Sequence, residues 1–145
     1  MSTEENKAAE RRFYEEVWNK HNLGTVDDLV APDVVEHNPV VPGQAPGLEG
    51  FRQMVKMSLS AFPDGQITIE DQIAEGDEVV VRWTAYNMTH RGEFAGIPAT
   101  GKQLTVAGID IYRYEGGKRV ETWRQWDALG MMRQLGVVPS PRKPG

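Results

Sequence analysis

The stretch that decides the fold is QLTVAGIDIYRYEGGKRVETWRQWD, residues 103–127. Two runs rich in β-branched and aromatic residues, 103–115 and 118–127, flank the dipeptide Gly116-Gly117. A Gly-Gly pair between two such runs is a strong signal for a two-residue turn in a β-hairpin. We therefore expect two long antiparallel strands at the end of the chain.

The hairpin turn also predicts which side chains face each other. If the two glycines set the register, Ile109 lies opposite Arg124, and Arg124 shares the more apolar face of its strand with Thr122 and Trp126. A guanidinium is costly to bury without a partner. We expect Arg124 either to meet a carboxylate or to line a wet cavity where it binds an anionic or carbonyl-bearing ligand. The alternative is an arginine at the rim whose stem covers apolar surface.

Upstream of the hairpin the pattern predicts more sheet and then helices. Two further strands, Gln66–Ile73 and Val79–Thr89, flank the turn Gly76-Asp77. Before them, apolar residues recur at helical spacing in three segments, at residues 4–20, 25–30 and 48–62, with a brief strand around residues 34–35. This order indicates an α+β fold in which three helices cover one face of a curved, mostly antiparallel sheet and enclose a pocket.

The chain has 145 residues, of which 39% are hydrophobic and 26% charged, as in ordinary globular domains. We expect a single domain over residues 1–138 and a disordered tail over residues 139–145. We recognise neither a signal peptide nor an apolar run long enough to span a membrane, so we expect a cytoplasmic protein with no membrane partner.

The charge balance and the missing cysteines exclude several kinds of function. The formal net charge of −5 argues against binding to nucleic acid, and the absence of cysteine excludes disulfides, thiolate metal sites and cysteine nucleophiles. We find no pair of histidines or His and Glu at metal-ligand spacing, and no phosphate-binding glycine loop. We expect chemistry without metal or cofactor.

Histidines and aspartates remain as candidates for proton transfer. His37 and His90 lie at strand ends beside Gly/Pro loops, where each is either an acid–base group or a hydrogen-bonded anchor for the loop. Asp110 and Asp127 interrupt apolar strands, where each is either a carboxyl group tuned by burial or the partner of an arginine. His21, at a helix end, fits a capping role.

Several ordered motifs resemble those of the SnoaL-like polyketide cyclases, a family of the nuclear-transport-factor-like superfamily of cone-shaped α+β barrels. The resemblance spans nearly the whole chain and rests on six segments in order: VEHNP (35–39), PGLEGF (46–51), AFPD (61–64), HRGEFAGIPATGK (90–102), GIDIYRY (108–114) and GKRVETW (117–123).

The resemblance implies a small-molecule substrate and cofactor-free aldol ring closure of a polyketide ester, and it implies a homodimer paired through the outer sheet face. It also implies an acid–base aspartate directly after the pair Thr122-Trp123, a position that Arg124 occupies here. An arginine does not act as a base near neutral pH. Three possibilities stay open: a base supplied by Asp127 or a histidine, a role in the oxygenation of aromatic polyketides, or binding without catalysis.

We expect ten residues to form the site. The proposed catalytic residues are His37, His90, Arg124 and Asp127. The proposed substrate-binding residues are Tyr14, Trp18, Phe51, Trp83, Asp110 and Trp126.

Overall fold

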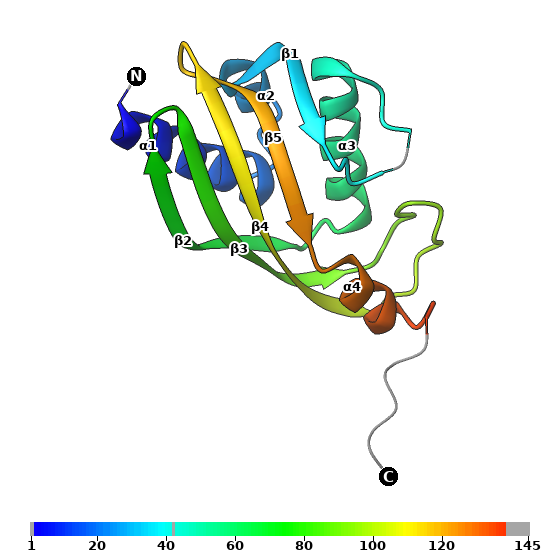
Figure 1. The fold of residues 1–145 in the computed structure, drawn as a ribbon. Helices are drawn as coiled ribbons and strands as arrows, with labels where there is room; N and C mark the ends of the chain where they lie inside the picture. The colour runs from blue at the N-terminus through cyan, green and yellow to red at the C-terminus, as the bar shows by residue number, and fades with distance from the viewer. Residues whose placement is uncertain (1, 42, 139–145) are drawn as a thin grey trace.

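The chain folds around a curved five-stranded sheet, and Figure 1 labels its five strands. The computed structural model describes residues 2–41 and 43–138. The strand order is β1-β5-β4-β3-β2, in which β1 runs parallel to β5 and the other neighbours are antiparallel. The strands are β1 (Val30–His37), β2 (Gln66–Glu75), β3 (Glu78–Thr89), β4 (Gln103–Glu115) and β5 (Lys118–Trp126). The predicted α+β class is confirmed, although the sheet stays open and does not close into a barrel.

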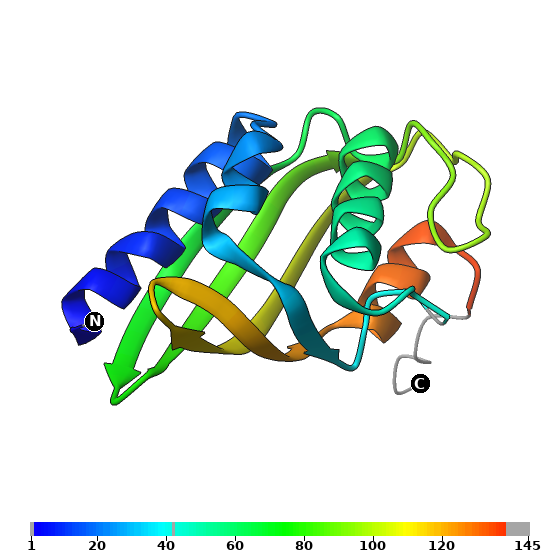
Figure 2. The same cartoon turned by 90° about the horizontal axis from the view of Figure 1, so that it is seen from above.

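Helices cover one face of the sheet, as Figure 2 shows from above. The first helix packs on β2 and β3, the third on β1, and a fourth, which we did not predict, on β4. The helices are α1 (Thr3–Phe13), the π-helix η1 (Tyr14–Asn19), α2 (Gly24–Leu29), α3 (Gly47–Ala61) and α4 (Ala128–Leu135). No helix in the described part of the chain is long and apolar enough to cross a bilayer.

The first helix begins as the sequence predicts and ends differently. Ser2 accepts a hydrogen bond from the backbone of Glu5, whose side chain accepts one from the Ser2 backbone, so the capping box is formed. Six residues near the end of the predicted single helix, Tyr14–Asn19, wind as a π-helix. Such wide turns are frequent at functional sites, and this one places Tyr14 at the sheet's inner face.

A bulge in β5 makes the predicted hairpin register wrong. The pairs next to the turn are as expected, with Tyr114 beside Arg119, but Arg113 pairs with Glu121, so Val120 is an extra residue on β5. Beyond this point every pair is displaced by one residue, and Arg124 lies opposite Asp110 instead of Ile109. Since the extra residue also interrupts the alternation along β5, Arg119 and Arg124 both point to the covered face of the sheet.

Two buried clusters hold the helices on the sheet. The larger joins α1, η1, α2 and α3 to strands β1, β3 and β4, and includes Phe13, Val17, Phe51 and Tyr112. The smaller lies at the other end, where Phe94 of the 90–102 loop packs with residues of α3, β4 and α4. The tail predicted over residues 139–145 lies outside the described residues.

Candidate active site

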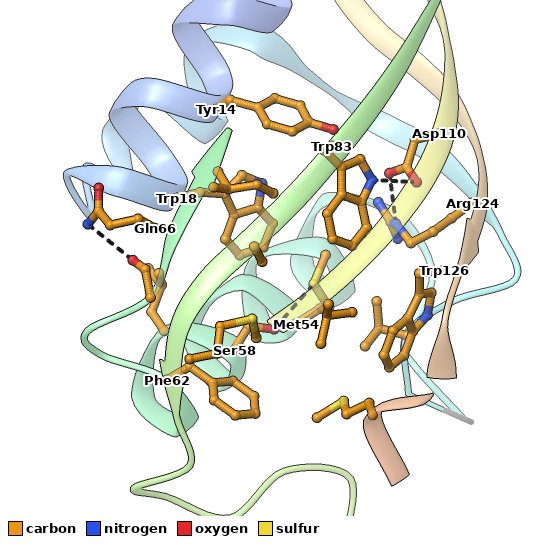
Figure 3. A pocket seen from close by; sticks show the side chains of 18 of the residues that line it. Tyr14, Trp18, Met54, Ser58, Phe62, Gln66, Trp83, Asp110, Arg124 and Trp126 are labelled. Atoms are coloured by element: carbon orange, nitrogen blue, oxygen red, sulfur yellow. Dashed lines mark hydrogen bonds and ion pairs between the residues drawn. The ribbon is translucent and has the colours of Figure 1, made fainter. Parts of the chain in front are cut away.

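A pocket lies between the helices and the inner face of the sheet, and Figure 3 shows its interior. It encloses about 910 Å³ of empty space, counting its open mouth. Most of its wall is apolar. Three of the four tryptophans, Trp18, Trp83 and Trp126, contribute to it. Such a wall suits a flat, largely hydrophobic molecule.

Asp110 is the centre of the polar part of the pocket. Its Oδ1 accepts a hydrogen bond from Trp83 Nε1 at 3.2 Å, and its Oδ2 accepts from Tyr112 Oη at 2.9 Å and Arg124 Nε at 3.1 Å. Figure 3 shows the contacts with Trp83 and Arg124. Asp110 and Arg124 come together because they are direct cross-strand partners on β4 and β5.

Two phenols extend this polar cluster toward η1. The hydroxyl oxygens of Tyr14 and Tyr112 lie 2.5 Å apart, and since Tyr112 donates its proton to Asp110, Tyr14 donates to Tyr112. Burial, followed by the negative charge of Asp110, raises the pKa of both phenols well above 10. Both groups are therefore neutral donors at neutral pH, arranged as a chain that ends on Asp110.

Arg119, which lines the pocket, forms a fully buried ion pair with Glu10. Arg119 donates from Nη2 to both carboxylate oxygens of Glu10, at 2.8 and 2.7 Å, and from Nε at 3.1 Å, and Tyr114 donates to the same carboxylate. The Arg119 guanidinium lies 3.8 Å from the centre of the Tyr112 ring. Burial raises the pKa of the Glu10 carboxyl, and the charge of Arg119 opposes that effect.

Arg124 has a second acidic neighbour on the side of β1. Glu36 Oε2 lies 3.5 Å from Arg124 Nη1, and only 5% of the Glu36 side chain is exposed. Burial works against the charge on Arg124, but Glu36 and Asp110 outweigh it and raise the pKa of the guanidinium. Arg124 is therefore a permanent cation held between two carboxylates.

The structure brings together five of the six expected binding residues and one expected catalytic residue, Arg124. Tyr14, Trp18, Trp83, Asp110, Arg124 and Trp126 all line the pocket. Phe51 does not line it. Its side chain has no exposed surface and packs edge-on against Phe13, with ring centres 5.9 Å apart, because α3 turns this residue into the core beneath the pocket.

The other three expected catalytic residues do not line the pocket. His37 lies on the outer face, stacked on Trp123 and bonded through Nε2 to Glu121 Oε2 at 2.7 Å. Asp127 is exposed and caps α4 by accepting a hydrogen bond from the Gly130 backbone at 2.8 Å.

His90 is buried and ties down the 90–102 loop. Its Nδ1 accepts a hydrogen bond from the Thr100 backbone at 3.2 Å and lies 3.0 Å from Thr100 Oγ1, which assigns the ring proton to Nε2. This arrangement matches the loop-anchoring alternative for His90.

Sequence reasoning missed several polar residues of the site. Tyr112 could have been found, because it lies two residues after Asp110 and so shares its strand face. Glu10 also gave a signal, since it falls on the apolar stripe of α1 with Phe13 and Val17. Arg119 gave a signal too, because the predicted register already pairs it with Tyr114, which shares its strand face with Asp110 and Tyr112. Within residues 2–41 and 43–138, no three His, Asp or Glu side chains group as metal ligands would.

Comparisons with known proteins agree with this architecture. The model of the family of SnoaL-like polyketide cyclases matches residues 8–135. The aklanonic acid methyl ester cyclase DnrD of Streptomyces peucetius is 31% identical over 131 residues, covering 83% of this chain and 87% of the relative.

Two solved structures extend the similarity. TsrD of Streptomyces laurentii is 29% identical with a TM-score of 0.86, and the comparison covers 95% of this chain and 99% of TsrD. AclR of Streptomyces galilaeus, a candidate hydroxylase, is 28% identical with a TM-score of 0.81, covering 95% of this chain and 100% of AclR. The family match over residues 8–135, on a fold shared with these solved structures, shows that this protein belongs to the SnoaL-like polyketide cyclases.

Proposed function

We propose that the protein binds a flat, carbonyl-bearing polyketide and closes a ring on it by an intramolecular aldol reaction. The observation that carries this proposal is the placement of Asp110. It is the one carboxylate among the described residues that line the pocket, and it touches Arg124 and Tyr112. An acid–base group beside a fixed cation in an apolar pocket suits the formation of an enolate.

In the proposed reaction, Asp110 removes a proton from the carbon next to a carbonyl group. The electron pair of the broken C–H bond moves to the carbonyl oxygen, and the positive charge of Arg124 stabilises the resulting enolate oxygen. The enolate carbon then attacks a second carbonyl carbon of the same molecule. The new alkoxide takes the proton back from Asp110, so the product has the same composition as the substrate.

The substrate class rests on the pocket wall and on the relatives. Trp18, Trp83 and Trp126 offer aromatic surface for fused rings. The name of DnrD describes a cyclase that acts on aklanonic acid methyl ester. This ester is therefore the first compound to test on the present protein.

A second candidate function is hydroxylation of an aromatic polyketide. Arg124 favours it because a fixed cation stabilises an enolate or phenolate, the electron-rich form that reacts with molecular oxygen. The similarity to AclR also supports it. The two functions differ in their product, because cyclisation conserves mass whereas hydroxylation adds one oxygen atom of O2 and needs a two-electron donor, such as a reduced nicotinamide, to reduce the other atom to water.

The test is to incubate the purified protein with aklanonic acid methyl ester in air, with and without a two-electron donor such as NADPH, and to follow products by liquid chromatography and mass spectrometry. A product of unchanged mass supports the cyclase, a product heavier by one oxygen supports the hydroxylase, and no conversion and no binding contradicts both. Deuterium uptake from heavy water at the acidic carbon reports proton removal separately from ring closure.

Two pocket variants and two matched control variants test which residues catalyse the proposed reaction. Asp110→Asn and Arg124→Gln should each lower kcat by at least about 100-fold. The same changes on the outer face, Glu121→Gln and Arg113→Gln, should leave kcat within about twofold. Equal activity of the Asp110 and Glu121 variants would contradict the role of Asp110.

We also propose that the outer face of the sheet pairs with a second copy of the chain. Ile73, Val80, Ile111 and Trp123 are consecutive cross-strand partners on that face. Ile73 is 62% exposed. An apolar row across a sheet face is typical of a protein interface. Light scattering should give the mass of a dimer, and Ile111→Glu should give a monomer that keeps its fold.

A further inference from the structure

Glu36, Thr122 and Arg124 form a second polar cluster, behind the pocket. Glu36 and Thr122 are paired residues of β1 and β5, and Arg124 follows two residues later on the same face. The Thr122 side chain is fully buried, and the exposed fractions of the Glu36 and Arg124 side chains are 5% and 7%. Helix α3 packs over this edge of the sheet.

This cluster has unused hydrogen-bonding capacity. Four of its atoms, Glu36 Oε1, Glu36 Oε2, Thr122 Oγ1 and Arg124 Nη1, have no hydrogen-bond partner among the described residues. Glu36 Oε2 and Arg124 Nη1 lie 3.5 Å apart, too far for a good direct hydrogen bond. Buried polar atoms are almost always satisfied, and internal water is a frequent partner.

We propose that Glu36, Thr122 and Arg124 bind one internal water molecule, and that this water positions the guanidinium of Arg124. The water donates hydrogen bonds to Glu36 and to Thr122 Oγ1 and accepts one from Arg124 Nη1. The charges select water over an ion, because Arg124 disfavours a bound cation and Glu36 disfavours an anion.

The water would give Arg124 a second tether. Asp110 holds Nε at 3.1 Å, and the water holds Nη1, so two different nitrogen atoms of the planar group are fixed. Without the water, Asp110 is the only hydrogen-bond partner of the guanidinium among the described residues, and Glu36 holds it by charge alone. Arg124 and Asp110 are direct partners across the strands, so the second tether must come from the side of β1. Glu36 is thus a positioning residue, and the benefit of this tether for catalysis rests on the proposed function.

The first test is a crystal structure of the free protein at a resolution that shows bound water. We expect one ordered water within hydrogen-bond distance of Glu36, Thr122 Oγ1 and Arg124 Nη1. In Thr122→Val, which keeps the volume and the charge, the water should be lost and the guanidinium should turn away from its wild-type plane. A dry site in the wild type, or a direct Glu36–Arg124 hydrogen bond there, would overturn the proposal.

The second test uses the free protein in solution. The exchange rate of the Arg124 Nε hydrogen with solvent, followed by NMR, should rise at least about tenfold in Thr122→Val because the group moves more freely. The matched control Thr105→Val, on the exposed side of β4, should not change it. Equal exchange rates in the two variants would refute the positioning role.

These measurements remain decisive if the proposed function fails. Neither the water nor the exchange rate depends on a substrate. If the wild type neither converts nor binds aklanonic acid methyl ester, the reaction is refuted while the water site is still decided by crystallography and NMR. If the wild type is active, Thr122→Val should lower kcat about tenfold with less effect on KM, and Thr105→Val should lower neither.

Discussion

The buried pair of Glu10 and Arg119 offers the sharpest test of how the site is built. Glu10 comes from α1 and Arg119 from β5, 109 residues apart in sequence, and neither side chain is more than 2% exposed. The informative changes are Glu10→Leu, Arg119→Met and the two combined. Each single change leaves one charged group buried without its partner, whereas the double change leaves an apolar contact of similar volume.

The expected magnitude follows from the geometry. Arg119 donates three hydrogen bonds to Glu10, and both groups have been removed from water. Removing one member of a buried ion pair costs about 3–5 kcal/mol, and replacing both with apolar residues is often neutral or stabilising. For a domain with a total stability of about 5–15 kcal/mol, this loss is between about one fifth and all of the free energy of unfolding.

Urea denaturation followed by circular dichroism would measure these free energies of unfolding. We expect each single variant to lose about 3–5 kcal/mol and the double variant to recover more than about 2 kcal/mol of that loss. If Glu10→Leu costs less than about 1 kcal/mol, or if the two losses simply add, the pair is not the buried, mutually dependent contact described above.

The remaining predictions concern packing, capping and pH. Gly108→Ala should destabilise the fold by about 1–3 kcal/mol, because its methyl group would lie 2.4 Å from a ring carbon of Trp83; an unchanged melting temperature and tryptophan fluorescence would contradict this. Asp127→Ala should cost about 1 kcal/mol in thermal unfolding while Asp127→Asn retains the cap, and a large loss of turnover in both variants would instead show a catalytic role. The hydrogen bond from His37, together with the hydrogen bond from Arg113, lowers the pKa of Glu121 below 4.5. The ionised Glu121 side chain therefore stabilises the fold above pH 4.5, and this stabilisation is lost as the pH falls through the lowered pKa of the folded state. Carbon NMR titration should show this pKa rising toward 4.5 in His37→Gln, and an unmoved pKa would assign the effect elsewhere.

Much of the fold could be predicted because its signals are local. The predicted strand 103–115 matches β4, and Gly116-Gly117 forms the turn. The Ser2 capping box likewise depends on residues only three positions apart. Period and turn chemistry act over a few residues, so a single sequence contains them in full.

The sequence by itself also determined much of the pocket wall, because alternation along a strand places side chains on faces. Asp110 and Arg124 were both selected as site residues, but the predicted register put them on opposite faces of the hairpin, whereas the structure places both in the pocket wall. The same reasoning placed His37, His90 and Asp127 among the catalytic residues, but none of them lines the pocket. A position at a strand end does not reveal whether the side chain will face the pocket, anchor a loop or cap a helix.

Only the tertiary structure decided which polar groups meet. One extra residue in β5, Val120, shifts the hairpin pairing and brings Arg124 opposite Asp110. The partners Glu36 and Glu10 reach Arg124 and Arg119 from distant segments. A bulge depends on small differences in how two strands pack against the helices that cover the sheet. A buried ion pair depends on contact between elements far apart in the chain. Neither is encoded in the spacing of neighbouring residues, which is why the sequence determined the layers and the structure decided the site.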